Sequence, residues 1–487
     1  MSFVSLSYLL FLPTVLLLYA ALPVRLRNPM LLLASYGFYM CWNPVYALLM
    51  LLSTVLTYVC GLCMEHRLCG QKKLWLVLSL VLNLAILFVF KYFNFFADTI
   101  AAALKPFGLG APAAHLNLLL PVGISFYTFQ ALGYTIDVYR GTVAAERNFI
   151  TYALFVSFFP QLVAGPIERS GSILPQLKQT HRLCWDDFAS GIVPIFWGVF
   201  KKMVIADNLA VAVNAAYNAP ADASALQLAL ATVLFAFQIY CDFSAYSDIA
   251  RGSAKMFGIE LMQNFDRPYL ATSIRSFWQR WHRSLSTWFK DYIYFPLGGS
   301  RVGLLRRCAN LFVVFLISGL WHGAALTFVV WGALHGLYQV VGTFTRPARQ
   351  TALRLLKIPE SSRLLAVLRC AVTFALVCFA WIWFRANSVS DAVCVIQRIF
   401  LLAPGGGSLV DQFVGLGISQ KNWIMLFCAL LLLTATDFFA GPHDWEARIA
   451  RCTPLRYGVL LALIAAVLLF GAYGESVSPQ AFVYFQF

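Results

Sequence analysis

Charged residues are scarce in this chain, since Asp, Glu, Lys and Arg make up 12% of its 487 residues; about 25% is usual in soluble domains. Acidic residues are the rarer kind, with 21 Asp and Glu against 36 Lys and Arg, for a net charge of +15. The mean hydropathy of +0.74 indicates a polytopic membrane protein and excludes a string of soluble domains. Apolar residues form continuous runs that do not alternate, which favours membrane helices over a transmembrane barrel. We therefore predict one all-α integral membrane domain over residues 1–487.

Several catalytic and metal-binding patterns are also lacking. The sequence has no Gly-rich phosphate loop ending in Lys-Ser/Thr and no Gly-x-Ser-x-Gly elbow. Cys60 and Cys63 form a Cys-x-x-Cys, but no second pair lies nearby at zinc spacing, so we expect no metal site. Asp242 and Asp248 are six residues apart, hence on different faces of a helix, which disfavours a paired-carboxylate site.

The basic excess fits a membrane protein better than a nucleic-acid-binding protein, because Lys and Arg concentrate in cytoplasmic loops that face anionic lipid. Arg25 and Arg27 follow the first apolar run, Lys72 and Lys73 the third, and Arg140 the fifth. If these loops face the cytoplasm, the N-terminus faces out. The expected membrane segments are residues 2–24, 29–42, 45–64, 73–91, 117–139, 364–384, 423–440 and 455–473.

The middle of the chain is less regular. Its apolar runs at 149–165, 190–206 and 226–243 are interrupted by prolines, by Lys201 and Lys202 and by Asp242. Broken helices at membrane depth are tolerated where they line a cavity. We therefore predict that residues 120–300 line a cavity.

His322 is the first catalytic candidate. It lies within an apolar run at 311–331 that is long enough to cross a bilayer. An ionisable side chain at that depth marks a functional site by default, and histidine is suited to proton transfer near neutral pH. A helix-packing histidine is the equally weighted alternative. In a continuous helix His335 lies about 140° around from His322, so we expect it to serve packing.

His282 is the second candidate. Residues 275–293, taken as one helix, separate an apolar face from a basic face, which is typical of an interfacial helix. His282 lies on the border of the two faces, so it is either an amphipathic anchor or a polar group that reaches a cavity. The basic residues that we expect to hold an anion are Arg275, Arg280, Arg283 and Lys290.

Seven motifs follow one another along the chain, at residues 118–130, 159–168, 242–248, 264–269, 276–282, 296–299 and 320–323. Their order resembles the membrane-bound O-acyltransferase (MBOAT) superfamily, in its alginate O-acetylase membrane-subunit branch. The resemblance runs nearly end to end, up to the aromatic tail at 482–487. The resemblance implies a ring of roughly 10–12 transmembrane helices, with re-entrant and interfacial helices, around a funnel open to the cytoplasm. It divides the domain into N-terminal spans (1–116), an MBOAT core with both histidines (117–345) and C-terminal spans (346–487).

The resemblance also implies an activity. His322 matches the essential histidine of the family and His282 its upstream partner position. The donor would be acetyl-CoA or another cytoplasmic acyl thioester, used as substrate with no bound cofactor. The acyl group would cross the cell (inner or plasma) membrane to an alginate-like or other surface polysaccharide, with an SGNH-type acyltransferase partner. The alternatives are D-alanyl transfer to teichoic acid from a carrier protein and a transporter for a glycan or lipid precursor.

Overall fold

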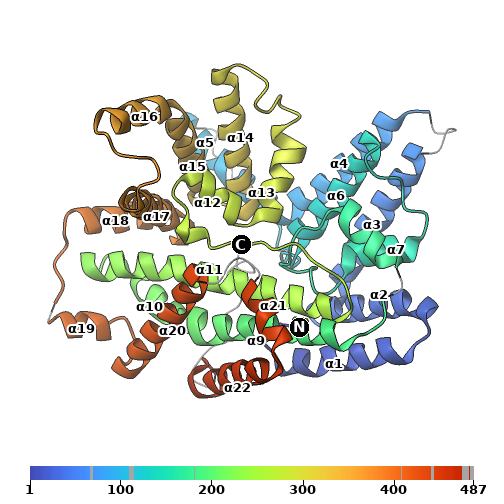
Figure 1. Cartoon of the computed structure of the whole chain (residues 1–487). Coiled ribbons are helices and arrows are strands. Elements are labelled where there is room, and N and C mark those ends of the chain that lie inside the picture. Colours follow the sequence, from blue (N-terminus) through green and yellow to red (C-terminus); the bar gives the residue numbers. More distant parts are fainter. Residues whose placement is uncertain are drawn as a thin grey trace. The chain divides into compact units, whose positions relative to one another are not determined.

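A computed structural model describes residues 1–65, 70–108, 115–179, 181–406, 408–439, 444–473 and 482. Within these ranges every regular element is a helix, and eight helices are long and apolar enough to cross a membrane (Figure 1). The chain forms two compact units. The first comprises Met1–Ile195 and Tyr246–Met262, and the second comprises Phe196–Ala245 and Gln263–Phe487. Helices α9 (Trp185–Phe200) and α11 (Ala225–Met256) contribute residues to both.

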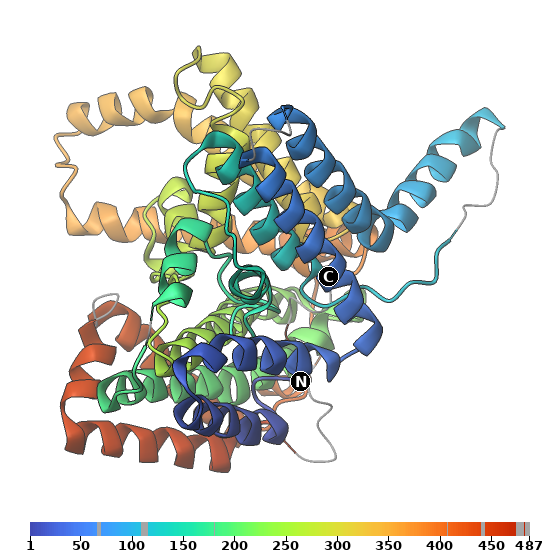
Figure 2. The ribbon, with the colours of Figure 1, turned by 90° about the vertical axis from the view of Figure 1, so that its right-hand side faces the viewer.

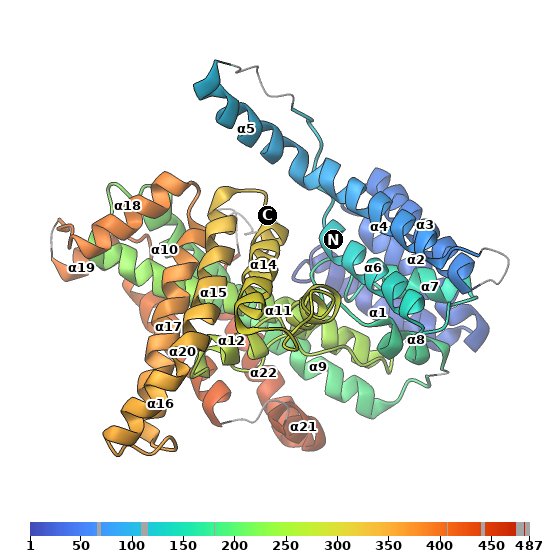
Figure 3. The same cartoon turned by 90° about the horizontal axis from the view of Figure 1, so that it is seen from above.

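The first unit contains the five predicted N-terminal segments, and each is confirmed as a helix. These are α1 (Leu6–Ala21), α2 (Val24–Met40), α3 (Pro44–Glu65), α4 (Lys72–Leu87) and α6 (Ile124–Arg140). The remaining elements are η2 (Phe88–Tyr92), α5 (Phe93–Leu104), η3 (Lys105–Phe107), α7 (Phe149–Ser157) and α8 (Ser170–Lys178). Helix α5 was not expected, and it extends away from the rest of this unit (Figures 2 and 3).

Helix α6 forms the centre of the first unit and is buried along most of its length against α3 and α4. Hydroxyl groups link these apolar helices: Ser79 Oγ donates to Thr135 Oγ1 at 3.2 Å, and the Tyr152 hydroxyl donates to Thr57 Oγ1 at 2.7 Å. Such bonds between helices satisfy polar groups that lipid cannot solvate.

The second unit carries both histidine candidates. Its elements are η4 (Lys201–Ala206), α10 (Asp207–Tyr217), η5 (Pro268–Leu270), α12 (Ile274–Arg280), α13 (Arg283–Phe289), η6 (Lys290–Tyr294), α14 (Leu304–His322), α15 (Leu326–Phe344), α16 (Arg346–Leu355), α17 (Arg363–Arg385), α18 (Val389–Phe400), α19 (Leu409–Val414), α20 (Gln420–Phe439), α21 (Asp444–Arg451) and α22 (Thr453–Phe470). The three predicted C-terminal segments are confirmed as α17, α20 and α22. Of the aromatic tail at 482–487, only Phe482 lies within the described residues.

Two expectations about continuous helices are wrong. The apolar run at 311–331 is not one span, because α14 ends at His322 and Gly323 is extended, with φ −161°. Conversely, α11 continues through Asp242 without a break. Its carboxylate is paired with Lys202, so the helix can keep this charge inside the protein.

Helices α14 and α15 pack side by side through glycines (Figure 1). A Cβ atom on Gly332 would meet the carbonyl oxygen of Phe315 and would lie 3.2 Å from the Cα atom of Gly319. Both neighbours are backbone atoms of α14, so they cannot move aside separately. Small residues allow this close approach of two membrane helices.

We expect Gly332→Ala to lower the free energy of unfolding by about 1–3 kcal/mol, because the methyl group overpacks a helix contact. Gly342→Ala, in the same helix, is the matched control, since nothing lies within 4 Å of a Cβ atom there. The control should be neutral or slightly stabilising, because alanine favours a helix over glycine. Thermal unfolding of the two purified variants measures the difference, and equal melting temperatures would contradict the expectation.

Candidate functional site

His322 occupies the last position of α14, where its side chain is 4% exposed. The imidazole lies among aromatic rings, with ring centroids 5.0 Å from Trp321, 5.0 Å from Trp331 and 5.4 Å from Phe384. These rings come from the end of α14, from α15 and from α17. Three helices of the second unit therefore enclose His322 in apolar surroundings.

His282 lies between two short helices and not within one. The expectation of a single helix over 275–293 is wrong: α12 ends at Arg280, Trp281 is extended and His282 adopts the left-handed conformation, with φ 43° and ψ 56°. This region is costly for a residue with a Cβ atom, so surrounding contacts must hold it. The expected separation of apolar and polar residues does persist, because Trp278, Trp281 and Trp288 are buried.

Asn264 holds the turn at His282. Its backbone oxygen accepts from the Arg283 N–H at 3.0 Å, and its side-chain oxygen accepts from the Ser284 N–H at 3.2 Å. The Asn264 side chain is fully buried. In the sequence this residue belongs to the motif at 264–269, and no role was predicted for it. The available signal was the residue type, because the short amide side chain of Asn can cap backbone N–H groups at the start of a helix.

Both histidines contact the same indole ring. The Trp321 ring lies 5.9 Å from the His282 ring and 5.0 Å from the His322 ring, between centroids. Phe243 of α11 also packs against His282, and the centroids of the two rings are 4.7 Å apart. The structure thus brings together two side chains that are forty residues apart in the sequence.

Burial lowers the pKa of His282 to about 3, and its side chain is fully buried. The imidazole is therefore neutral at physiological pH. A neutral imidazole offers one N–H donor and one acceptor nitrogen. His282 can accordingly donate a hydrogen bond to an oxyanion without carrying a positive charge.

The four predicted anion-binding residues are spread over the elements around His282. Arg275 and Lys290 are exposed, while Arg280 and Arg283 are half-buried. None of these cations forms an ion pair with the residues that the structure describes. Their charges therefore remain uncompensated by the described part of the protein.

His335 is a packing residue. Its Nδ1 atom accepts from the indole N–H of Trp278 at 3.2 Å, and its ring lies 5.0 Å from that of Trp331. The side chain is fully buried. This hydrogen bond connects α12 to α15 and so supports the helix that precedes His282.

A buried ion cluster that was not predicted from the sequence lies between α9 and α10, at η4. Lys202 Nζ lies 2.6 Å from Asp242 Oδ1 and 2.8 Å from Asp207 Oδ1. Next to it, Lys201 Nζ donates to Ser244 Oγ at 2.7 Å. Asp242 and Ser244 flank Phe243, the residue that packs against His282. The cluster therefore fixes the stretch of α11 that contacts the site.

Glu168 in the first unit is a buried acid that ends the motif at 159–168. Its side chain accepts a hydrogen bond from the Met262 N–H at 2.5 Å and is 3% exposed. Burial raises the pKa of this carboxyl from 4.5 to about 7, against the opposing effects of that hydrogen bond and of Arg169. The folded state therefore retains a proton that the unfolded chain releases.

We expect the stability of the protein to fall as the pH rises from about 4.5 to about 7, because the folded state binds more protons than the unfolded state in this window. The pKa shift corresponds to about 3 kcal/mol. Glu168→Gln should remove this part of the pH dependence, and thermal unfolding at pH 5 and pH 8 measures it. An unchanged pH dependence in the variant would contradict the assignment.

No group of three or more His, Cys, Asp or Glu side chains is placed to hold a metal ion in the part of the chain that the structure describes. The features of the second unit define a buried histidine site in a multi-pass membrane protein. This site has two imidazoles, an aromatic enclosure and basic residues near one of the imidazoles.

Comparison with known proteins identifies the class. A profile of the MBOAT, membrane-bound O-acyltransferase family matches residues 143–383. The chain is 36% identical to the "Probable alginate O-acetylase AlgI" of Pseudomonas putida, over 98% of each chain. It is also 36% identical to the peptidoglycan O-acetyltransferase of Helicobacter pylori, over 98% of this chain and 95% of that protein. The teichoic acid D-alanyltransferase of Bacillus subtilis is 27% identical, over 56% of this chain and 70% of that protein.

The chain therefore belongs to the MBOAT family and is a membrane O-acyltransferase. This membership confirms the predicted family, fold class and enzyme class, and it disfavours the transporter alternative.

Proposed function

We propose that the chain is an O-acetyltransferase of the cell (inner) membrane that uses cytoplasmic acetyl-CoA to O-acetylate an extracytoplasmic polysaccharide. The observation that carries this proposal is the shared contact of His282 and His322 with Trp321. Two full-length relatives that are named as O-acetyl-transferring enzymes support the acetyl group. An alginate-like glycan is the favoured acceptor.

In the proposed mechanism His322 is the general base. It takes the proton of the acceptor hydroxyl, whose oxygen attacks the carbonyl carbon of the thioester. The ester C–O bond forms, the C–S bond breaks, and the thiolate leaves and takes the proton from His322. A positioned base contributes on the order of 10²–10⁴ in rate.

His282 and the basic residues around it have supporting roles in this proposal. The neutral imidazole of His282 donates its N–H to the oxyanion that develops on the thioester carbonyl. Arg275, Arg280, Arg283 and Lys290 bind the phosphates of the donor. Their lack of ion pairs with described residues supports this role, because guanidinium groups recognise phosphate by charge and by paired hydrogen bonds. An SGNH-type partner completes transfer outside the membrane.

The test is thioester consumption by the purified protein, measured as released thiol. One arm supplies acetyl-CoA and the other a D-alanyl thioester on a carrier protein, each with and without an alginate acceptor and an SGNH-type partner. We expect thiol release from acetyl-CoA that increases when the acceptor is present. Release from the carrier protein alone would replace this proposal with D-alanyl transfer, which the partial match to the Bacillus subtilis protein supports.

A further inference from the structure

The first unit contains a cavity of about 200 Å³ that is remote in sequence from the histidine site. It lies at the turn from α1 to α2 and is completed by the start of α7 and the end of α8. Its lining includes Arg25, Arg27, Lys178 and His181, which are basic or can become so, and no lining residue is acidic. The cavity is therefore suited to an anion.

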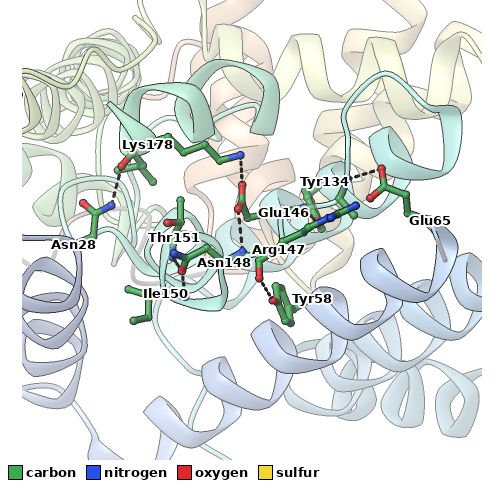
Figure 4. A network of polar contacts seen from close by, with 12 residues as sticks. Asn28, Tyr58, Glu65, Tyr134, Glu146, Arg147, Asn148, Ile150, Thr151 and Lys178 are labelled. Carbon is green, nitrogen blue, oxygen red and sulfur yellow. Dashed lines mark hydrogen bonds and ion pairs between the residues drawn. The ribbon is translucent and has the colours of Figure 1, made fainter. Parts of the chain in front are cut away.

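Contacts within the unit hold this lining in place. The Arg27 guanidinium stacks on the Tyr19 ring at 4.7 Å and donates to the backbone oxygen of His181 at 2.6 Å. Asn28 donates to the backbone oxygen of Leu177 at 2.7 Å, which ties α2 to α8 (Figure 4). Arg27 is thus ordered before any ligand arrives, which lowers the entropic cost of binding.

Two of the positive charges at the cavity remain available. Lys178 is paired with the buried Glu146 at 2.5 Å, so its charge is compensated (Figure 4). Arg27 donates to the backbone oxygens of Leu22 and His181 and contacts the Tyr19 side chain, but it forms no ion pair in the described structure. Arg25 is exposed and makes no side-chain hydrogen bond or ion pair there. The first turn of α2, which has no side-chain cap, adds backbone N–H groups near these two guanidiniums.

We propose that this cavity binds the phosphate headgroup of an anionic phospholipid. Its volume is below the roughly 300–1,000 Å³ of small-molecule sites, so a headgroup fits better than a whole nucleotide. The apolar side chain of Val24, which lines the cavity, is 50% exposed and can contact acyl chains. The turn is one of the basic loops expected at the cytoplasmic face, where anionic lipids attract basic residues. The proposal is independent of the acyl-transfer chemistry.

The test measures ligand binding to the delipidated, full-length protein by native mass spectrometry. The ligands are phosphatidylglycerol, phosphatidylcholine, inorganic phosphate and coenzyme A. The variants are Arg25→Ala and Arg25→Glu. Arg182→Glu is the matched control, because Arg182 is exposed, follows the cavity residue His181 and does not line the cavity. Gel filtration and thermal unfolding confirm that each variant is folded.

We expect phosphatidylglycerol to bind better than phosphatidylcholine. Arg25→Ala should weaken its binding about fivefold and Arg25→Glu about 25-fold, because each basic residue near the surface contributes about a factor of five. Arg182→Glu should bind as the wild type does. Equal binding by Arg25→Glu and the wild type, or an equal loss in Arg182→Glu, would overturn the proposal. Arg25-dependent binding of phosphate or coenzyme A without a preference for phosphatidylglycerol would overturn the lipid assignment.

Discussion

His322→Ala should reduce acyl transfer by a factor on the order of 10²–10⁴, the contribution of a positioned general base. The imidazole lies at the end of α14 within 5.4 Å of three aromatic rings, measured between centroids. His282 also contacts Trp321, but burial lowers its pKa to about 3, so it is too weak a base to replace His322 in the proposed role. Thiol release from the thioester donor and acylation of the acceptor measure the loss.

Two further variants separate chemistry from folding. His322→Gln fills most of the space that alanine leaves among the aromatic rings, and it should be equally inactive because an amide is not a base at neutral pH. His115→Ala is the histidine control, since His115 is half-exposed and its Nε2 atom lies 3.1 Å from Asp98 in the first unit. It should keep full activity. Normal acylation by a well-folded His322→Ala protein would refute the assignment of the base.

Hydropathy was sufficient to predict that the eight expected membrane segments are helical, because burial in lipid requires long apolar runs whatever their neighbours are. Five of the eight coincide with helices long and apolar enough to cross a membrane. Hydropathy could not predict where α14 ends. The residues on both sides of His322 are apolar, so the pattern continues across the break at Gly323. The helix ends just before Gly323, where the backbone becomes extended. Glycine is common at helix ends, but Gly319 lies inside α14, so a glycine alone did not mark the end.

The positions of His282 and Lys202 depend on distant residues. The turn at His282 is held by Asn264, eighteen residues earlier, and a helical periodicity contains no information about that contact. Lys202 and Asp242 are forty residues apart and looked like interruptions of two apolar runs. Because Lys202 and Asp242 pair with each other, neither helix has to break at its charged residue. This pairing is visible only in the folded structure. Residue chemistry singled out the two histidines as candidates, because ionisable groups in apolar sequence are rare, and their catalytic role stays a prediction.

Lys202→Met should lower the free energy of unfolding by about 3–5 kcal/mol, the usual cost of removing one partner from a buried ion pair. The ammonium group lies between two carboxylates, and the side chains of Lys202 and Asp242 are each 2% exposed. Without the lysine, Asp207 and Asp242 lose their shared cation in a span where water cannot replace it. Thermal unfolding of the detergent-purified variant measures the effect, with loss of the monodisperse peak as the readout.

Neutralising the carboxylates tests the cause of that loss. The triple variant Lys202→Met, Asp207→Asn and Asp242→Asn removes the buried charges together, so it should recover part of the stability lost in Lys202→Met. Lys421→Met is the matched control at an exposed lysine of α20 and should change the stability by less than about 0.5 kcal/mol. If Lys202→Met melted like Lys421→Met, the ion cluster would have no structural role. The other outcome is that Lys202→Met melts at a lower temperature than Lys421→Met and that the triple variant recovers stability but not acyl transfer. In that case the charges themselves are needed to hold Phe243 against His282.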